Sequence, residues 1–191
     1  MRWCARRAAL PASSPSRKTF IQSLGEGRAV TYSAILDGCY RYELEFELGG
    51  NGPVASVFMV NPATADGVKK DHTIRKLDGF GSRLGWSKYI VGNKHAFRAT
   101  DVDELKTAAD PVGPYNAGHI LAIMLRSQIT VVAWGTLSKL PPQLRNNWRL
   151  VADIAASINR PLYCWGTCAD GHPVHPVMIG YNRKLELWNK P

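Results

Sequence analysis

The sequence VASVFMV at residues 54–60, followed by Asn61 and Pro62, decides the fold. An unbroken apolar run of this length is typical of a strand that is buried on both faces, as in a parallel sheet. Pro62 has no backbone N–H to donate to a neighbouring strand, so the strand is expected to end there. The pattern therefore predicts a central strand in a sheet that is covered on both sides.

Further strands and helices alternate around this run. Apolar residues at spacings of three and four predict an amphipathic helix over residues 71–86. The other expected elements are strands at 30–36, 40–48, 88–92, 129–134 and 161–165, and helices at 101–108, 115–127 and 143–157. This alternation predicts an α/β fold: a three-layer sandwich with a mostly parallel central sheet, preceded by an N-terminal β-hairpin whose turn is Asp37-Gly38.

Composition and charge restrict the class of protein. The chain has 191 residues, of which 45% are hydrophobic, and this excludes a fully disordered or collagen-like protein. Its net charge of +9 favours a polyanionic partner, but residues 1–18 hold five basic residues and no acid, so the remainder is only mildly basic. We interpret residues 1–28 as a basic flexible leader and residues 29–191 as a single α/β domain.

The N-terminal region also bears on location. Its Arg- and Ser-rich, acid-poor composition is shared by transit peptides, but the sequence lacks the apolar stretch of a secretory signal. No apolar run approaches the roughly 20 residues that cross a bilayer. We therefore expect a cytoplasmic protein without a membrane partner.

Two asparagines follow predicted strands. Ligands of open α/β sheets bind at the carboxyl ends of the strands, where Asn61 and Asn93 are expected to lie. An asparagine amide offers an acceptor and two donors in one plane, as the recognition of a base edge requires. Both segments also have a structural explanation. Asn61 is typical of a strand-ending turn, and Thr100-Asp101, shortly after Asn93, are typical of a helix cap.

A third candidate segment lies near the C-terminus. His172 and His175 are each followed by proline, which holds the backbone extended and fixes the direction of both side chains. Histidines in a surface turn are the structural alternative. Cys164 and Cys168 are the nearest thiols, and their spacing matches no zinc motif, so we expect no metal and no cofactor.

The order of these features resembles the uracil-DNA glycosylase superfamily. There, a motif after the first core strand positions a water, an asparagine after the next strand reads the base, and a late His-Pro loop carries the catalytic histidine. The resemblance implies a uracil-DNA-glycosylase-like fold, with Asn61 as the water-positioning residue, Asn93 as the base reader and His175 as the catalytic histidine. It covers roughly residues 54–180, including Val131–Gly135 as an apolar strand that ends in glycine.

A second resemblance spans most of the chain. Tyr40-Arg41-Tyr42, residues 61–66, residues 71–75, Asn93, residues 98–101, residues 110–114 and His175-Pro176 are similar to the bacterial and phage family called domain of unknown function 1643. This family has no assigned reaction, so the resemblance supports the fold and leaves the chemistry open.

Together these features predict a DNA-acting N-glycosylase-like protein that removes or recognises a modified or damaged base flipped out of DNA. The alternatives are a module that binds nucleic acid or a modified nucleotide without catalysis, and an enzyme acting on free nucleotides. An amide at Asn61 cannot act as a conventional general base, which favours the binding module. The expected roles are catalysis for Asn61 and His175, substrate binding for Asn93, Asp66, Thr73 and Phe97, and nucleic-acid binding for Arg75, Lys94, Arg98 and His172.

Overall fold

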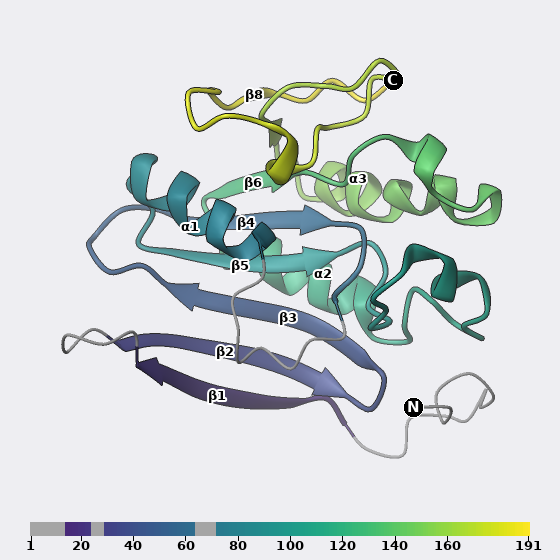
Figure 1. Cartoon of the computed structure of the whole chain (residues 1–191), viewed down its shortest axis with the longest axis horizontal. Helices are drawn as coiled ribbons and strands as arrows, with labels where there is room; N and C mark the ends of the chain where they lie inside the picture. The colour runs from purple at the N-terminus through teal and green to yellow at the C-terminus, as the bar shows by residue number, and fades with distance from the viewer. Residues whose placement is uncertain (1–13, 24–28, 64–71) are drawn as a thin grey trace.

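The run at residues 54–60 forms β4 (Val54–Met59), a strand inside the sheet. The computed structural model describes residues 14–23, 29–63 and 72–191 (Figure 1). β4 pairs in parallel with β5 (Lys88–Asn93) on one side and with β6 (Ile129–Val132) on the other. Ala55, Val57 and Phe58 have no exposed surface, as predicted for a strand covered on both faces.

The described residues form a mixed sheet of eight strands in the order β1-β2-β3-β5-β4-β6-β7-β8. The prediction of a mostly parallel, uracil-DNA-glycosylase-like sandwich is wrong, because four of the seven pairings are antiparallel. The parallel part of the sheet consists of β5, β4, β6 and β7, which pair in parallel with one another in that order. The remaining strands are β1 (Ser16–Ser23), β2 (Ala29–Asp37), β3 (Tyr40–Glu47), β7 (Leu162–Cys164) and β8 (Glu186–Leu187).

The hairpin of β2 and β3 is part of the main sheet. The backbone of β3 pairs antiparallel with β5, from Leu44 opposite Val91 to Glu47 opposite Lys88. The sequence pattern places residues 1–28 in a leader, but β1 pairs along its whole length with β2. The expected leader therefore includes a strand, and residues 1–13 and 24–28 lie outside the described part of the chain.

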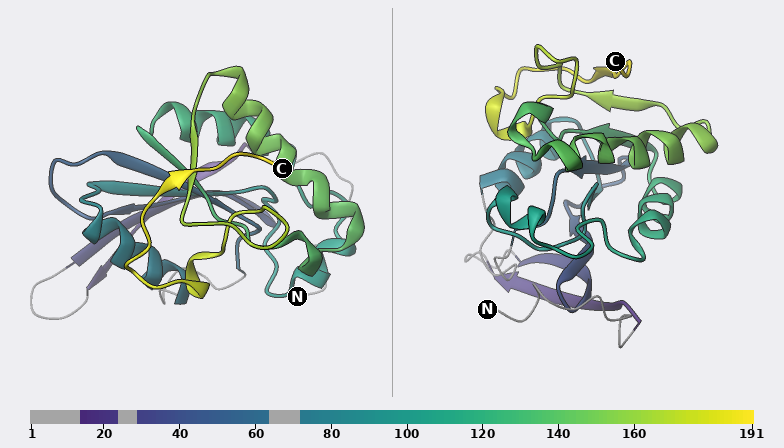
Figure 2. Two further views of the ribbon diagram at one scale, coloured as in Figure 1. Left: turned by 90° about the horizontal axis from the view of Figure 1, so that it is seen from above. Right: turned by 90° about the vertical axis from the view of Figure 1, so that its right-hand side faces the viewer.

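Helices pack on both faces of the sheet. Figure 2 shows α1 (His72–Arg83) and η5 (Pro176–Met178) on one side, with α2 (Asn116–Leu125) on the other. α1 covers a core that includes Val57 and Val91, whereas α2 and α3 (Trp148–Ser157) cover one that includes Phe58 and Ile90. Successive strand residues point to opposite faces, so β4 and β5 contribute alternately to the two cores.

Short 3-10 helices replace some of the expected α-helices. The helix expected at 101–108 is η2 (Val102–Lys106), which Asp101 and Glu104 begin with a reciprocal capping box. The helix expected at 143–157 divides into η4 (Pro142–Asn147) and α3. A further turn, η3 (Leu137–Lys139), follows β6. η2 and η3 each follow the carboxyl end of a strand. The start of η2 contributes to the edge of the sheet where the candidate site lies.

Candidate functional site

A cavity of about 270 Å³ opens at the carboxyl ends of β4 and β5. The end of β4, the end of β5, the first turn of α1, the start of η2 and the loop before η5 all contribute to its wall. The lining residues that carry polar groups are Arg41, Asn61, Thr73, Asn93, Thr100 and His175. Four residues selected from the sequence, namely Asn61, Thr73, Asn93 and His175, therefore share one cavity, although they come from distant parts of the chain.

Asn93 ends β5 and faces this cavity from within the sheet. It pairs with Met59 of β4 and is only 3% exposed. Its backbone carbonyl accepts a 3.0 Å hydrogen bond from Nδ2 of Asn116 on α2, which fixes the strand end. Its side-chain Oδ1 is buried, and no donor among the described residues reaches it. Because an unsatisfied buried acceptor costs on the order of 1–3 kcal/mol, this oxygen is suited to accept a hydrogen bond from a ligand.

Asn61 has a fixed orientation. Its Nδ2 donates to the backbone carbonyls of Ala99 at 2.9 Å and Pro62 at 3.2 Å. The Ala99 N–H in turn donates to the Pro62 carbonyl at 3.0 Å, so the segments after β4 and β5 are held together. Asn61 therefore has the strand-ending role that the sequence suggested. Because Nδ2 makes these bonds, Oδ1 of Asn61 can accept a hydrogen bond from a ligand or a water.

His175 reaches the cavity from the C-terminal part of the chain. It precedes η5 with extended backbone angles of φ −73° and ψ 139°. The preceding loop is anchored by two backbone bonds, from Gly135 N–H to the Pro173 carbonyl at 2.8 Å and from Val174 N–H to the Gly166 carbonyl at 3.0 Å. Gly135 has φ +77°, a conformation that favours glycine, and this explains the glycine after β6.

Several residues expected to contact nucleic acid do not lie on the surface. Phe97 is 9% exposed and packs edge-on against Tyr40, so it is part of a core and cannot stack on a base. Lys94 has no exposed surface and His172 is 5% exposed, so neither can hold a phosphate from where it lies. The predicted phosphate-contact and base-stacking roles of these three residues are therefore not supported by their positions.

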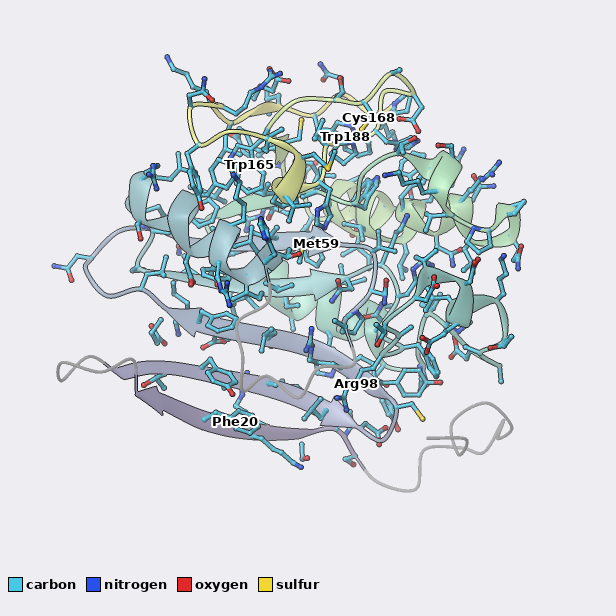
Figure 3. All side chains as sticks on the ribbon, in the orientation of Figure 1. Phe20, Met59, Arg98, Trp165, Cys168 and Trp188 are labelled. Carbon is cyan, nitrogen blue, oxygen red and sulfur yellow. The ribbon has the colours of Figure 1, made fainter. Side chains whose placement is uncertain are left out.

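The other expected contacts are dispersed. Arg75 is exposed on α1. Arg98 is half-buried, and its backbone N–H donates to the Cys39 carbonyl at 2.9 Å, which places it beside the β2–β3 turn. Figure 3 shows Arg98 below Met59, which lies at the carboxyl end of β4. Asp66 falls in residues 64–71, outside the described part of the chain.

A buried basic cluster lies behind Asn93, on the opposite face of the sheet. Lys94 follows Asn93 and points toward α2 and α3, with Nζ 5.7 Å from the centre of the Trp134 ring. No hydrogen-bond acceptor among the described residues contacts Nζ. Burial lowers the pKa of Lys94 to about 7. The amine therefore has a substantial neutral population at physiological pH.

His95 and His172 belong to the same cluster. Burial, and then the neighbouring Lys94, lowers the pKa of His95 to about 4. The neutral ring of His95 bridges two segments, since Nδ1 lies 3.1 Å from the Val60 carbonyl and Nε2 lies 3.0 Å from Nδ2 of Asn147. Burial also lowers the pKa of His172, although Asp170 opposes this change. Both imidazoles are therefore neutral near pH 7. The contact of His95 with the Val60 carbonyl holds a residue that lines the cavity.

Arg41, Thr100 and Val102 are among the lining residues that were not selected from the sequence. Arg41 belongs to β3, which the sequence placed in a separate hairpin, and only the antiparallel pairing of β3 with β5 brings it to the cavity. The sequence feature that could have identified Arg41 as a site residue is its place in the Tyr40-Arg41-Tyr42 motif. Thr100 and Val102 flank the capping residue of η2, whose role looked purely structural.

Within residues 14–23, 29–63 and 72–191, no three His, Cys, Asp or Glu side chains lie close enough together to hold a metal ion. Among the helices of the described residues, none has the length and apolar character needed to span a membrane.

Comparison with known proteins establishes the family. The model of the family described as "Protein of unknown function (DUF1643)" matches residues 41–177, and the chain belongs to this family. The match includes all six polar residues that line the cavity, namely Arg41, Asn61, Thr73, Asn93, Thr100 and His175. No curated protein and no solved structure matches the chain.

Proposed function

We propose that this member of the DUF1643 family binds a nucleobase in the cavity and hydrolyses the N-glycosidic bond that joins the base to its sugar. The observation that carries the proposal is Asn93, which lines the cavity and whose side-chain Oδ1 is buried without a donor from the described residues. A base edge offers ring or exocyclic N–H donors to Oδ1 and carbonyl or ring-nitrogen acceptors to Nδ2, all in one plane. A volume of about 270 Å³ is near the lower end of the roughly 300–1,000 Å³ typical of small-molecule pockets, and it fits a group the size of a base.

Two further polar residues of the cavity, His175 and Asn61, support the hydrolysis. When the bond between the sugar C1′ and the base nitrogen breaks, its electron pair stays with the base and C1′ becomes cationic. Protonated His175 would donate a proton or hydrogen bond to the departing base, which stabilises the developing negative charge. Oδ1 of Asn61 would orient a water that attacks C1′, and this water then releases one proton to solvent and remains on C1′ as a hydroxyl group.

Binding without hydrolysis is the second candidate. Asn61 can orient a water but cannot remove its proton, so hydrolysis would depend on a strongly cationic transition state. If this candidate is correct, the protein binds a base-containing ligand and releases no free base after long incubation.

The base could come from DNA or from a free nucleoside or nucleotide. The burial of Lys94 and His172 removes two of the four residues that were expected to contact nucleic acid, and this favours the small molecule. DNA remains the other source to test, because the cavity would hold the base in the same way after it is flipped out of the duplex.

The test is release of free base, followed by chromatography. The substrates are nucleosides, nucleotides, and single- and double-stranded oligonucleotides that contain uracil, damaged or hypermodified bases. His175→Asn should reduce release at least a hundredfold, whereas His72→Asn, at an exposed histidine outside the cavity, should leave it unchanged. Equal release by the His175 variant and the wild type would refute the assigned role, and binding without release would support the second candidate.

A further inference from the structure

A second cavity, which we call the α2 cavity, lies on the face of the sheet that α2 covers. Its volume of about 770 Å³ falls within the roughly 300–1,000 Å³ typical of small-molecule pockets. One wall is formed by α2 and the residues at its two ends, and the other by β1, β2 and β3. Its described lining shares no residue with that of the first cavity. The charged and titratable members of this lining are Arg17, Glu43, Tyr115, His119 and Arg126.

Glu43 and His119 form a carboxylate–imidazole pair in this lining. Nδ1 of His119 lies 2.7 Å from Oε1 of Glu43. Glu43 is 3% exposed, and Arg17 and Arg126 both contact its Oε2. Burial alone would raise the pKa of this carboxyl group, but the hydrogen bond from His119 and the charge of Arg126 outweigh it and lower the pKa. Glu43 is therefore an ionised acceptor, which keeps the proton of a neutral imidazole on Nδ1.

The other ring nitrogen of His119 is available to a ligand. The ring stacks on Tyr42, with the ring centres 4.7 Å apart and the planes 13° from parallel, so its orientation is fixed. With the proton on Nδ1, Nε2 carries a lone pair that can accept a proton. No described residue forms a hydrogen bond with Nε2, and the side chain is 18% exposed where it lines the α2 cavity. A carboxylate that orients a histidine in this way produces a general base.

We propose that the α2 cavity is a second reactive site, in which His119 activates a water for the hydrolysis of small carboxylic esters. The nucleophile is a water because the described lining contains no serine, threonine or cysteine. Ile35 and Pro114 give the lining apolar surface that would contact the organic part of the ester. The described contacts of Arg126 use three of its five N–H groups, on two carboxylates and a backbone carbonyl, and leave two donors for the ester oxygen.

The reaction is a general-base hydrolysis. Nε2 of His119 takes a proton from the water while the water oxygen bonds to the carbonyl carbon, and the electron pair of the C=O bond moves to the carbonyl oxygen. The remaining N–H groups of Arg126 donate to this oxyanion. When the oxyanion collapses, the bond to the alcohol oxygen breaks, and this oxygen leaves with the electron pair and takes the proton from Nε2. The products are a carboxylic acid and an alcohol, and His119 is neutral again.

The test follows the release of p-nitrophenol from p-nitrophenyl acetate by absorbance. The wild-type protein should react faster than free imidazole at the same concentration, and more slowly in heavy water than in water, because a proton moves in the transition state. His119→Asn should lower the rate about tenfold or more. His72→Asn, at an exposed histidine outside the α2 cavity, should leave the rate unchanged. Urea denaturation of His119→Asn checks that the variant is folded.

Gly118→Leu tests the site without changing the carboxylate–imidazole pair. A Cβ at Gly118 would meet no atom within 4 Å, so leucine should extend into the cavity beside His119, keep the fold and exclude the ester. The rate should again fall about tenfold or more. Ala156→Leu, at an exposed position of α3, is the matched control and should react like the wild type.

Several outcomes would overturn the proposal. Equal rates for the wild type and a folded His119→Asn variant, or an undiminished rate for Gly118→Leu, would remove the α2 cavity from the reaction. An equal rate in water and heavy water would contradict general-base catalysis by His119. Inhibition of ester hydrolysis by a nucleoside would assign the reaction to the first cavity, because the two cavities share no described lining residue.

Discussion

Replacing Lys94 by methionine should stabilise the protein, and the gain should depend on pH. Lys94 has no exposed surface, and its Nζ contacts no acceptor among the described residues. Its pKa in the folded protein is about 7, against an ordinary value of 10.5. The unfolded chain therefore binds more protons than the folded chain between about pH 7 and pH 10.5, and wild-type stability falls as the pH is lowered through this window.

The magnitude follows from the two pKa values. One pKa unit corresponds to about 1.36 kcal/mol, so the charge of Lys94 opposes folding by about 4 kcal/mol at pH 7 and by about 2 kcal/mol at pH 9. Methionine has a similar shape and does not titrate, so Lys94→Met should raise the free energy of unfolding by about these amounts. Urea denaturation followed by tryptophan fluorescence at both pH values measures the change.

Lys88, the first residue of β5, provides a control. Its ammonium contacts Glu47 at 2.8 Å and Glu45 at 2.9 Å, and the hydrogen bond that it donates to Glu47 raises the pKa of Lys88 despite partial burial. Its contribution to stability is present below the ordinary lysine pKa and is lost as the pH rises through the folded value, so Lys88→Met should destabilise modestly. The reasoning is refuted if Lys94→Met destabilises the protein at pH 7, or if its effect is the same at pH 7 and pH 9.

Three further effects on stability can be measured by the same assay. Gly92→Ala should cost about 1–3 kcal/mol, because a Cβ there would lie 2.5 Å from the ring of Phe58, whereas Gly118→Ala on α2 meets no atom within 4 Å and should not destabilise. Wild-type stability should fall by up to about 3 kcal/mol as the pH drops from about 6.5 to about 4, because the pKa of His95 is lowered to about 4, and His95→Gln should reduce this slope. Glu43→Gln should cost about 3 kcal/mol, because this carboxylate is 3% exposed and contacts three basic side chains; a loss below 1 kcal/mol would contradict the structural role.

The sequence predicted the centre of the sheet better than its edges. The unbroken apolar run of β4 specified a buried strand, and the rule that ligands bind at carboxyl strand ends brought Asn61 and Asn93 together. Hydrophobic patterns carry no information on strand direction, however, so the antiparallel pairing of β3 with β5 could not be read from the residues. That pairing also explains why Arg41 was overlooked.

Side-chain parity accounts for the errors near the site. Successive residues of an extended segment face opposite sides of a sheet, so Lys94 necessarily points away from the cavity that Asn93 faces. If the alternation of side chains is continued one residue past the end of β5, Lys94 is excluded from the residues predicted to contact nucleic acid. The burial of Phe97 and His172 depends on contacts with Tyr40 and Trp148, which are distant in sequence and have no local signature.

The most direct test of the central claim is the binding of a panel of nucleosides and nucleotides to Asn93→Leu, measured by calorimetry beside urea denaturation. If Oδ1 of Asn93 serves a ligand, the variant should lose at least tenfold in affinity while keeping or increasing its stability, because leucine removes an unsatisfied buried oxygen. Asn146→Ala, at an exposed asparagine, should change neither quantity. Unchanged affinity in Asn93→Leu, or a loss of stability with no ligand bound by the wild type, would contradict the account.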